Sequence, residues 1–298
     1  MVYHTPVLLE ESIEGLNIQP DGVYVDVTYG GGGHSREILK HLTTGRLIAF
    51  DQDEDAAANV IDDKRLLFIR HNFRFFKNFL RYNGITQIDG LIADLGVSSH
   101  HFDQPDRGFS FRFDGMLDMR MNRNAKLTTI DVLNNYDDRT LYKIFRDYGE
   151  VENSGKLVKA IVDARQISKI ETIEQLKQVI EACMPKNREH KYLAKVFQAL
   201  RIEVNNEMDA LKELLLQSSQ VVKKDGRLVV ITYHSLEDRL VKSFFQKGKF
   251  DGEIEKDIYG KSYVPFESIN RKVIIPENSE LEENSRSRSA KLRIGKRI

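Results

Sequence analysis

The chain has a single cysteine, Cys183, among its 298 residues. One cysteine cannot form an intrachain disulfide or a multi-cysteine zinc site, which is typical of proteins from a reducing compartment. The sequence also lacks an apolar run near the ~18 residues that a membrane helix needs, and no basic-then-apolar leader follows Met1. We therefore expect neither a membrane span nor a secretory signal, and we predict a cytoplasmic protein that does not act at a membrane.

Net charge is also absent, because the chain carries 45 basic and 45 acidic residues. A nucleic-acid surface would therefore have to come from an uneven distribution of charge. The mixture of apolar and charged residues is that of an ordinary soluble globular protein. Its length exceeds one average domain, so we expect either two domains or one domain with an insertion.

Four consecutive glycines at 30–33 follow an apolar run and precede a helical pattern. A strand, a glycine-rich turn and a helix form the element with which doubly wound α/β folds bind nucleotide-like cofactors. The next apolar run ends in Asp51, about 20 residues beyond the turn, where such folds place an acid on a ribose hydroxyl pair. A merely flexible surface turn would not explain Asp51, so the sequence predicts a cofactor site.

The residues around the turn discriminate between nucleotides. A pyrophosphate-binding fingerprint needs a third glycine where this chain has Ser35, and it does not expect an acid such as Asp26 before the turn. S-adenosylmethionine has a cationic sulfonium, an ammonium group and no phosphate, so neighbouring acids suit it electrostatically. We therefore predict S-adenosylmethionine as the cofactor, with a nicotinamide-dependent oxidoreductase as the alternative.

Short apolar runs at α/β spacing predict the strands of a parallel sheet, at 23–27, 47–50, 66–69, 91–95 and 228–233. The residues between the fourth and fifth runs have helical periodicity, including a capping box at Thr172 and Gln175 and an apolar stripe that contains Cys183. We predict one domain from 1–105 plus 206–298, with a helical domain at 106–205 inserted after the fourth strand.

Polar residues follow two of these strands at the sheet edge where ligand crevices lie. The fourth strand ends in Asp94, and the fifth is followed by His234 and Asp238. A capped helix start that uses Ser235 and Asp238 is the structural alternative for the second group.

Two segments are candidates for RNA contacts. Phenylalanines alternate with arginines at 107–113, a pattern that suits base stacking and phosphate binding but also a strand or loop packed into a core. The tail at 284–297 has six cations and no acid. It suits phosphate contacts, and it also suits a solvated tail or an edge strand protected by basic residues.

Eight segments of the chain, in order, carry a resemblance to a known family. They lie at 4–9, 30–35, 94–99, 107–111, 117–121, 197–205, 234–239 and 286–293. Together they resemble the bacterial 16S rRNA cytosine-N4 methyltransferases of the MraW family, over essentially the whole chain. The resemblance implies a Rossmann-like class I methyltransferase fold with an inserted all-helical domain for substrate recognition. It also implies S-adenosylmethionine-dependent methylation of the exocyclic N4 amine of a decoding-centre cytosine, in the small ribosomal subunit or an assembly intermediate.

Residue roles follow from the resemblance by motif. Cofactor contacts fall on Gly32, Gly33, His34, Asp51, Phe73 and Asp94. The predicted RNA contacts come instead from the two candidate segments above, and they are Arg107, Arg286, Arg288, Lys291 and Arg293. The chain departs from the family pattern at His101, which replaces a glutamine and is carried over as a cofactor contact. It departs again at Met116, in place of proline, and at Thr232 and Tyr233, in place of a Ser-Phe pair.

The chemistry can be argued from the residues. Methylation at C5 of cytosine generally needs a cysteine nucleophile, but Cys183 lies on a predicted core stripe, so we expect direct attack by the amine nitrogen without a covalent enzyme intermediate. Our hypothesis is that Asp94 orients the amine or the cofactor, with His234 and Asp238 as further catalytic candidates. We predict no metal. The alternative of a ribosome-assembly factor that only binds RNA, the proton acceptor and a homodimer are left open.

Overall fold

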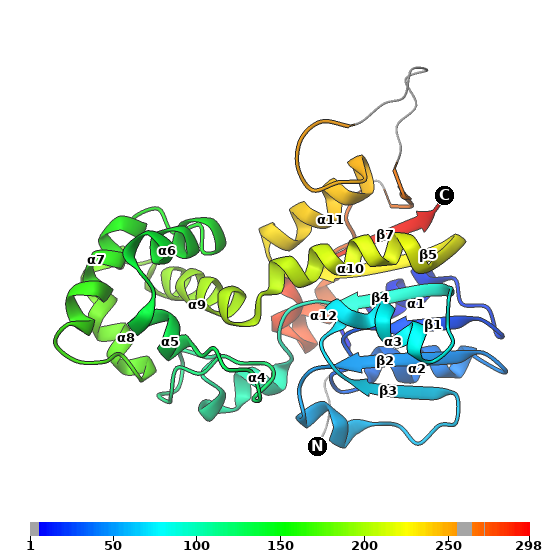
Figure 1. The fold of residues 1–298 in the computed structure, drawn as a ribbon, viewed down its shortest axis with the longest axis horizontal. Helices are drawn as coiled ribbons and strands as arrows, with labels where there is room; N and C mark the ends of the chain where they lie inside the picture. Colours follow the sequence, from blue (N-terminus) through cyan, green and yellow to red (C-terminus); the bar gives the residue numbers. More distant parts are fainter. Residues whose placement is uncertain (1–5, 255–263, 271) are drawn as a thin grey trace. The chain divides into compact units, whose positions relative to one another are not determined.

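The computed structural model describes residues 6–254, 264–270 and 272–298. The chain folds into two compact units, unit 1 with residues 1–96 and 208–298 and unit 2 with residues 97–207 (Figure 1). The chain leaves unit 1 directly after a sheet strand and returns near the start of the long helix α10 (Glu207–Val221). The sequence placed the insertion at 106–205, inside the observed unit 2.

Unit 1 is built on a seven-stranded sheet with the order β3-β2-β1-β4-β5-β7-β6. Its strands are β1 (Val23–Asp26), β2 (Arg46–Asp51), β3 (Leu66–Arg70), β4 (Ile88–Asp94), β5 (Val222–Thr232), β6 (Phe266–Ser268) and β7 (Lys291–Arg297). Strands β1 to β5 run parallel to one another, and β7 pairs antiparallel with β5 and β6. The predicted fold class, a Rossmann-like class I methyltransferase sheet, is confirmed.

The central strands are continuous apolar runs because helices cover the sheet. Helix α1 (Leu9–Leu16) packs against β4 and β5, α2 (Gly33–His41) against β2, and α11 (Ser235–Lys247) against β6 and β7. The remaining elements of unit 1 are η1 (Asp55–Asn59), η2 (Phe73–Phe75), α3 (Phe76–Tyr82), α12 (Asn278–Glu283) and η6 (Ser285–Ser289).

The basic tail is part of the sheet. Strand β7 lies between β5 and β6, with Leu292 and Ile294 buried in the core. The interpretations of the whole tail as a solvated segment or as an edge strand are therefore wrong. The alternation of apolar and basic residues has a physical reason: the apolar side chains pack into unit 1, whereas the cations stay at least partly exposed.

Unit 2 is helical. Its elements are α4 (Ser99–Asp103), η3 (Pro105–Arg107), α5 (Thr129–Asn135), α6 (Asp138–Lys143), η4 (Ile144–Tyr148), α7 (Ser154–Arg165), α8 (Ile173–Ile180), η5 (Glu181–Cys183) and α9 (Glu189–Asn205). The predicted capping box at Thr172 and Gln175 starts α8, which confirms it. Cys183 is buried in the core of this unit, as its place on the apolar stripe predicts.

Among the described residues, none of the helices combines the length and the apolar character that crossing a membrane requires.

Candidate cofactor and active site

Three aspartates meet at the carboxyl edge of the sheet in unit 1. Asp26, Asp51 and Asp94 are the last residues of β1, β2 and β4, and β1 lies between the other two strands. The strand order reverses between β1 and β4, and open α/β sheets bind ligands at such a switch point. We call these three residues the carboxylate cluster.

Two members of the cluster hold the glycine loop. Asp26 is buried and accepts hydrogen bonds from the Ser35 hydroxyl at 2.6 Å and from the Thr28 N–H at 3.0 Å. Asp51 accepts from the Gly30 N–H at 2.8 Å through one oxygen and from the Asp53 N–H at 2.9 Å through the other. Burial raises the pKa of both Asp26 and Asp51 to about 6. Asp26 at the end of β1 and Asp51 at the end of β2 therefore hold the glycine loop in place.

The loop has bare backbone where a side chain would not fit. Gly32 has a φ of 75°, and a Cβ there would lie 2.6 Å from the Tyr29 hydroxyl oxygen. A Cβ on Gly33 would lie 2.1 Å from Pro6, so its small size is also required by packing within unit 1. Gly32 precedes α2, and the free N–H groups of a helix start are available to a polar ligand.

Asp94, the third member, is half-buried and is held from two sides. Its carboxylate accepts a hydrogen bond from the Tyr233 hydroxyl at 2.8 Å, and its backbone N–H donates to Thr28 Oγ1 at 2.7 Å. Burial, together with the charges of Asp26, Glu237 and Glu280, raises the pKa of Asp94 to about 7, although the hydrogen bond from Tyr233 acts in the opposite direction. The sequence analysis did not single out Thr28 or Tyr233 as site residues. Their positions after β1 and β5 were the available signal, because those strand ends share one edge.

Within the part of the chain that the structure describes, the carboxylate cluster has no cationic side chain to neutralise it. Among the described residues, no Lys, Arg or His forms an ion pair with Asp26, Asp51 or Asp94. Acids that share a site without a counterion stabilise a bound cation. The arrangement of uncompensated carboxylates and bare glycine backbone fits S-adenosylmethionine, which has a sulfonium and an ammonium group.

The other predicted cofactor residues lie near this edge with different exposures. His34 is buried in α2, and its Nε2 lies 3.2 Å from the Val7 carbonyl oxygen. Burial lowers the pKa of His34 to about 4, so the ring is neutral at pH 7. Phe73 is half-buried at the start of η2. The neighbouring Asn72 donates to Gln52 Oε1 at 2.8 Å, which links the ends of β3 and β2.

His234 starts α11 as its N-cap residue. It forms a capping box with Glu237, and His234 Nε2 lies 3.2 Å from Glu237 Oε1. The structural alternative from the sequence is therefore wrong in its residues, since the cap is His234 and not Ser235 or Asp238.

Asp238 is already paired with cations. It accepts from Arg293 Nε at 2.7 Å and lies 3.5 Å from Lys291 Nζ. Burial alone would raise the pKa of Asp238, but the hydrogen bonds and charges of Arg293 and Lys291 together outweigh it and hold the pKa below the usual range. Asp238 is therefore a poor proton acceptor.

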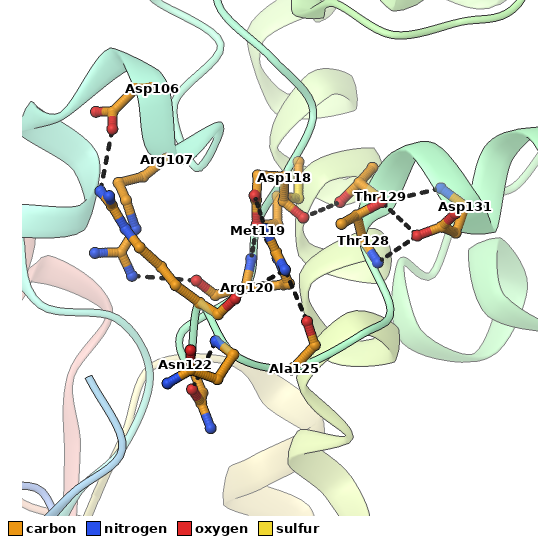
Figure 2. Close-up of polar contacts among 12 residues, drawn as sticks. Asp106, Arg107, Asp118, Met119, Arg120, Asn122, Ala125, Thr128, Thr129 and Asp131 are labelled. Carbon is orange, nitrogen blue, oxygen red and sulfur yellow. Dashed lines mark hydrogen bonds and ion pairs between the residues drawn. The ribbon is translucent and has the colours of Figure 1, made fainter. Parts of the chain in front are cut away.

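Arg107 lies inside unit 2. It is 2% exposed, and its Nη2 donates to the carbonyls of Arg120 and Met121 at 3.1 Å each. Figure 2 shows this contact beside the pair of Asp118 and Arg120, in which the carboxylate accepts two hydrogen bonds from the guanidinium. The guanidinium of Arg107 thus organises the loop that follows η3, which argues against the predicted contact with an RNA phosphate.

His101 and the phenylalanines at 107–113 divide between core and surface in unit 2. His101 is buried, caps α4 with Ser98, and has its ring centroid 4.7 Å from that of Phe109. Phe109 belongs to the core, Phe111 packs against it, and Phe113 is 47% exposed. The interpretation as a segment packed into a core therefore holds for Phe109 and Phe111, and base stacking by the exposed Phe113 stays a prediction.

The four basic residues predicted to contact RNA through the tail also differ. Arg286 and Arg288 are exposed on η6. Lys291 and Arg293 lie on β7 and face Asp238, and the Arg293 side chain is only 12% exposed. The first pair is exposed to solvent, whereas Arg293 is largely engaged within unit 1.

Known proteins resemble this chain over its full length. The description of the matching family is the MraW methylase family, over residues 1–298. The chain is 57% identical to the ribosomal RNA small subunit methyltransferase H of Bacteroides thetaiotaomicron, over 100% of the chain and 98% of the relative. It is 58% identical to the protein of that name from Parabacteroides distasonis, over 99% and 98% of the two lengths.

A solved methyltransferase from Streptococcus mutans, in complex with SAH, is 13% identical and covers 100% of both chains, with a TM-score of 0.41. This TM-score is too low to establish a shared fold. The fold is shown by the strand order of unit 1.

The full-length family match confirms that the protein is a methyltransferase and that S-adenosylmethionine is its methyl donor. It also contradicts the alternative of a nicotinamide-dependent oxidoreductase. By its sequence motifs, its length and its identity to these relatives, the chain belongs to the MraW methylase family.

Proposed function

We propose that this methyltransferase methylates the exocyclic N4 amine of a decoding-centre cytosine in 16S rRNA, within the small ribosomal subunit or an assembly intermediate. The name of the relatives, ribosomal RNA small subunit methyltransferase H, supports the RNA substrate. The N4 position and the decoding centre rest on the sequence motifs of the family. A cytoplasmic location stays a prediction. Whether the protein forms a homodimer stays an open question.

The observation that carries the chemistry is Asp94 at the switch point of the sheet. When bound, S-adenosylmethionine supplies an electrophilic methyl group on a sulfonium. The cytosine amine has two N–H groups, and a half-buried carboxylate held by Tyr233 can accept a hydrogen bond from one of them. Holding the nitrogen, the methyl group and the sulfur in line can lower the barrier by about 7 to 11 kcal/mol in total, and this hydrogen bond contributes part of that effect.

The remaining residues bind rather than react. Gly32, Gly33, His34, Asp51, Phe73 and His101 are proposed cofactor contacts, and Arg286, Arg288 and Lys291 are proposed RNA contacts. Cys183 is poorly suited to act as a nucleophile, because it is buried in the core of unit 2 and burial raises the pKa of its thiol. Unit 2 is proposed to recognise the RNA around the target base, which must be extruded from folded RNA to be methylated.

Methyl transfer to small ribosomal subunits tests the proposal. The protein is incubated with isotope-labelled S-adenosylmethionine and subunits from cells that lack this methyltransferase, and the RNA is digested to nucleosides for mass spectrometry. We expect labelled N4-methylcytidine from 16S rRNA. Labelled 5-methylcytidine would contradict the N4 assignment, and RNA binding without any methylation would favour the assembly-factor alternative.

Cys183→Ala is the matched control for the direct route. The substitution removes the sole thiol from a buried position, so we expect a small loss of stability and nearly unchanged turnover. Loss of turnover in a fully folded Cys183→Ala protein would instead indicate a covalent route.

A further inference from the structure

The proposed function leaves unspecified what the contact at the end of β5 does to Asp94. The hydroxyl of Tyr233 donates to Asp94 Oδ1 at 2.8 Å, joining the first residue after β5 to the last residue of β4. The sequence departs from the family pattern at this position. The contact therefore belongs to this chain's own residues, and it lies on the group that the proposed function assigns to the substrate amine.

The backbone and the ring of Tyr233 are both held. Its N–H donates to Glu237 Oε2 at 2.9 Å, and Glu237 is 2% exposed. The ring lies 3.4 Å from the position of a Cβ on Gly96, a residue with a φ of 96° just beyond Asp94. The hydroxyl thus has little freedom, and its direction toward Asp94 is fixed by the surrounding fold.

The hydrogen bond makes the two oxygens of the Asp94 carboxylate inequivalent. Oδ1 accepts from Tyr233, while among the described residues no group donates to Oδ2. Burial together with the Asp94 charge raises the pKa of Tyr233 well above 10, so the hydroxyl stays a donor over the working pH range. A donor that cannot ionise stabilises the charged form of its acceptor.

We propose that Tyr233 is a positioning residue, which fixes Oδ1 of Asp94, directs Oδ2 toward the substrate amine, and through its hydrogen bond favours the charged form of the carboxylate. The inference rests on the proposed function of Asp94. The groups that act against ionisation are all acids: Asp26 on β1, Glu237 on α11 and Glu280 on α12. Tyr233 is the one described side chain that donates a hydrogen bond to Asp94 against these charges.

Tyr233→Phe is the sharpest variant, because it removes the hydroxyl and keeps the ring beside Gly96. Tyr136→Phe is the matched control, since the Tyr136 hydroxyl also donates to a carboxylate, Glu203 Oε1 at 3.1 Å, within unit 2. Each variant loses one oxygen and one tyrosine–carboxylate hydrogen bond, so a shared effect reports general destabilisation.

The first measurement uses the free protein without RNA or cofactor. Carbon-13 NMR of labelled aspartate carboxyls follows the Asp94 signal from pH 5 to pH 9, and Asp94→Asn identifies that signal. We expect a higher titration midpoint for Asp94 in Tyr233→Phe than in the wild type, and no change in Tyr136→Phe. Identical midpoints in Tyr233→Phe and wild type would overturn the proposal.

The second measurement is methyl transfer as a function of pH. We expect kcat/KM of Tyr233→Phe to fall roughly tenfold at pH 6.5 and to recover above pH 8.5, because one pKa unit corresponds to a tenfold change. The substitution should have no effect in an Asp94→Asn background. A loss that is equal at every pH, or that persists without Asp94, would overturn the proposal.

The two measurements separate this inference from the proposed function. The NMR titration needs no substrate, so an RNA product other than N4-methylcytidine leaves its result standing. If instead N4-methylcytidine forms and the Asp94 midpoint does not move, the inference about Tyr233 fails alone.

Discussion

The same unit holds buried aspartates in two opposite electrostatic situations. The carboxylate cluster at the ends of β1, β2 and β4 has no ion-pair partner among the described residues, and burial raises the pKa of each member to about 6 or 7. Asp238, near β7, accepts a hydrogen bond from Arg293, which holds its pKa below the usual range.

The difference shows where the protein leaves room for a ligand's charge. A buried carboxylate without a counterion is costly in the free protein, and it is compensated when a cation binds. Asp238 is already paired with Arg293 within unit 1, so it contributes to stability and is not available to a cationic ligand. Residue type and burial alone would not separate the two sites; the neighbouring side chains do.

Asp94→Asn tests the reactive side of the comparison and should have the largest effect. Asparagine keeps the size of the side chain but loses the charge, so we expect turnover to fall by about 100- to 1,000-fold with the fold intact. Steady-state methyl transfer to small ribosomal subunits measures it. Asp238→Asn is the control, and an equal loss of turnover in a folded Asp238→Asn protein would end the distinction between the two sites.

Arg293→Gln tests the paired side. The substitution leaves the largely buried Asp238 with only the more distant Lys291 as a cationic partner, so we expect the free energy of unfolding at pH 7 to fall by about 3 kcal/mol. The side chains of Arg293 and Asp238 are 12% and 16% exposed, so solvent screening is modest. Chemical denaturation measures the loss.

Adding Asp238→Asn to Arg293→Gln should restore most of that stability, because no uncompensated charge remains. The penalty of Arg293→Gln should also shrink as the pH falls and Asp238 takes up a proton, because a neutral carboxyl needs no counterion. If the double variant were as unstable as the single one, packing rather than charge would explain the loss.

The pH dependence of cofactor binding is expected to be smaller, about tenfold. As the pH falls from 8 to 5.5, Asp94 and then Asp26 and Asp51 take up protons, because their pKa values are raised to about 7 and 6. The affinity for S-adenosylmethionine should fall over this range. S-adenosylhomocysteine, which lacks the sulfonium charge, should show a weaker trend. Titration calorimetry in buffers of different ionisation enthalpy measures both, and equal slopes for the two ligands would contradict the role of the cluster.

The exposed arginines of η6 should contribute least. Replacing Arg286 and Arg288 by glutamine removes two proposed phosphate contacts, so the slope of log affinity against log salt should fall by about 1.4. RNA binding at several salt concentrations measures it. Lys40 and Lys64, two exposed cations elsewhere on unit 1, give the matched double replacement. An unchanged slope in the arginine variant would remove η6 from the RNA surface.

Local patterns predicted much of this protein. The glycine turn, the apolar runs and the capping box at Thr172 depend on contacts within a few residues, and they occur where the sequence placed them. Asp51 could be identified because its distance from the turn is set by one helix and one strand. The family motifs added the activity and the cofactor, which periodicity cannot specify.

Other features depend on which distant segments pair. Nothing in the spacing of the tail reveals that β7 enters the sheet between β5 and β6, because that depends on hydrogen bonds to strands far along the chain. The sequence predicts Arg107 as a cation that contacts RNA. In the fold its guanidinium is buried and donates to the carbonyls of Arg120 and Met121.

By itself the sequence determined the elements, the cofactor class and the acids that could bind it. Tertiary structure alone decided which acids stay without a counterion, since Asp26, Asp51 and Asp94 come from three separate strands while Arg293 reaches Asp238 from the far end of the chain. It also brought Tyr233 to Asp94. The reason is physical: the charge state of a carboxylate is set by the groups within a few ångströms of it in space, and sequence distance does not measure that separation.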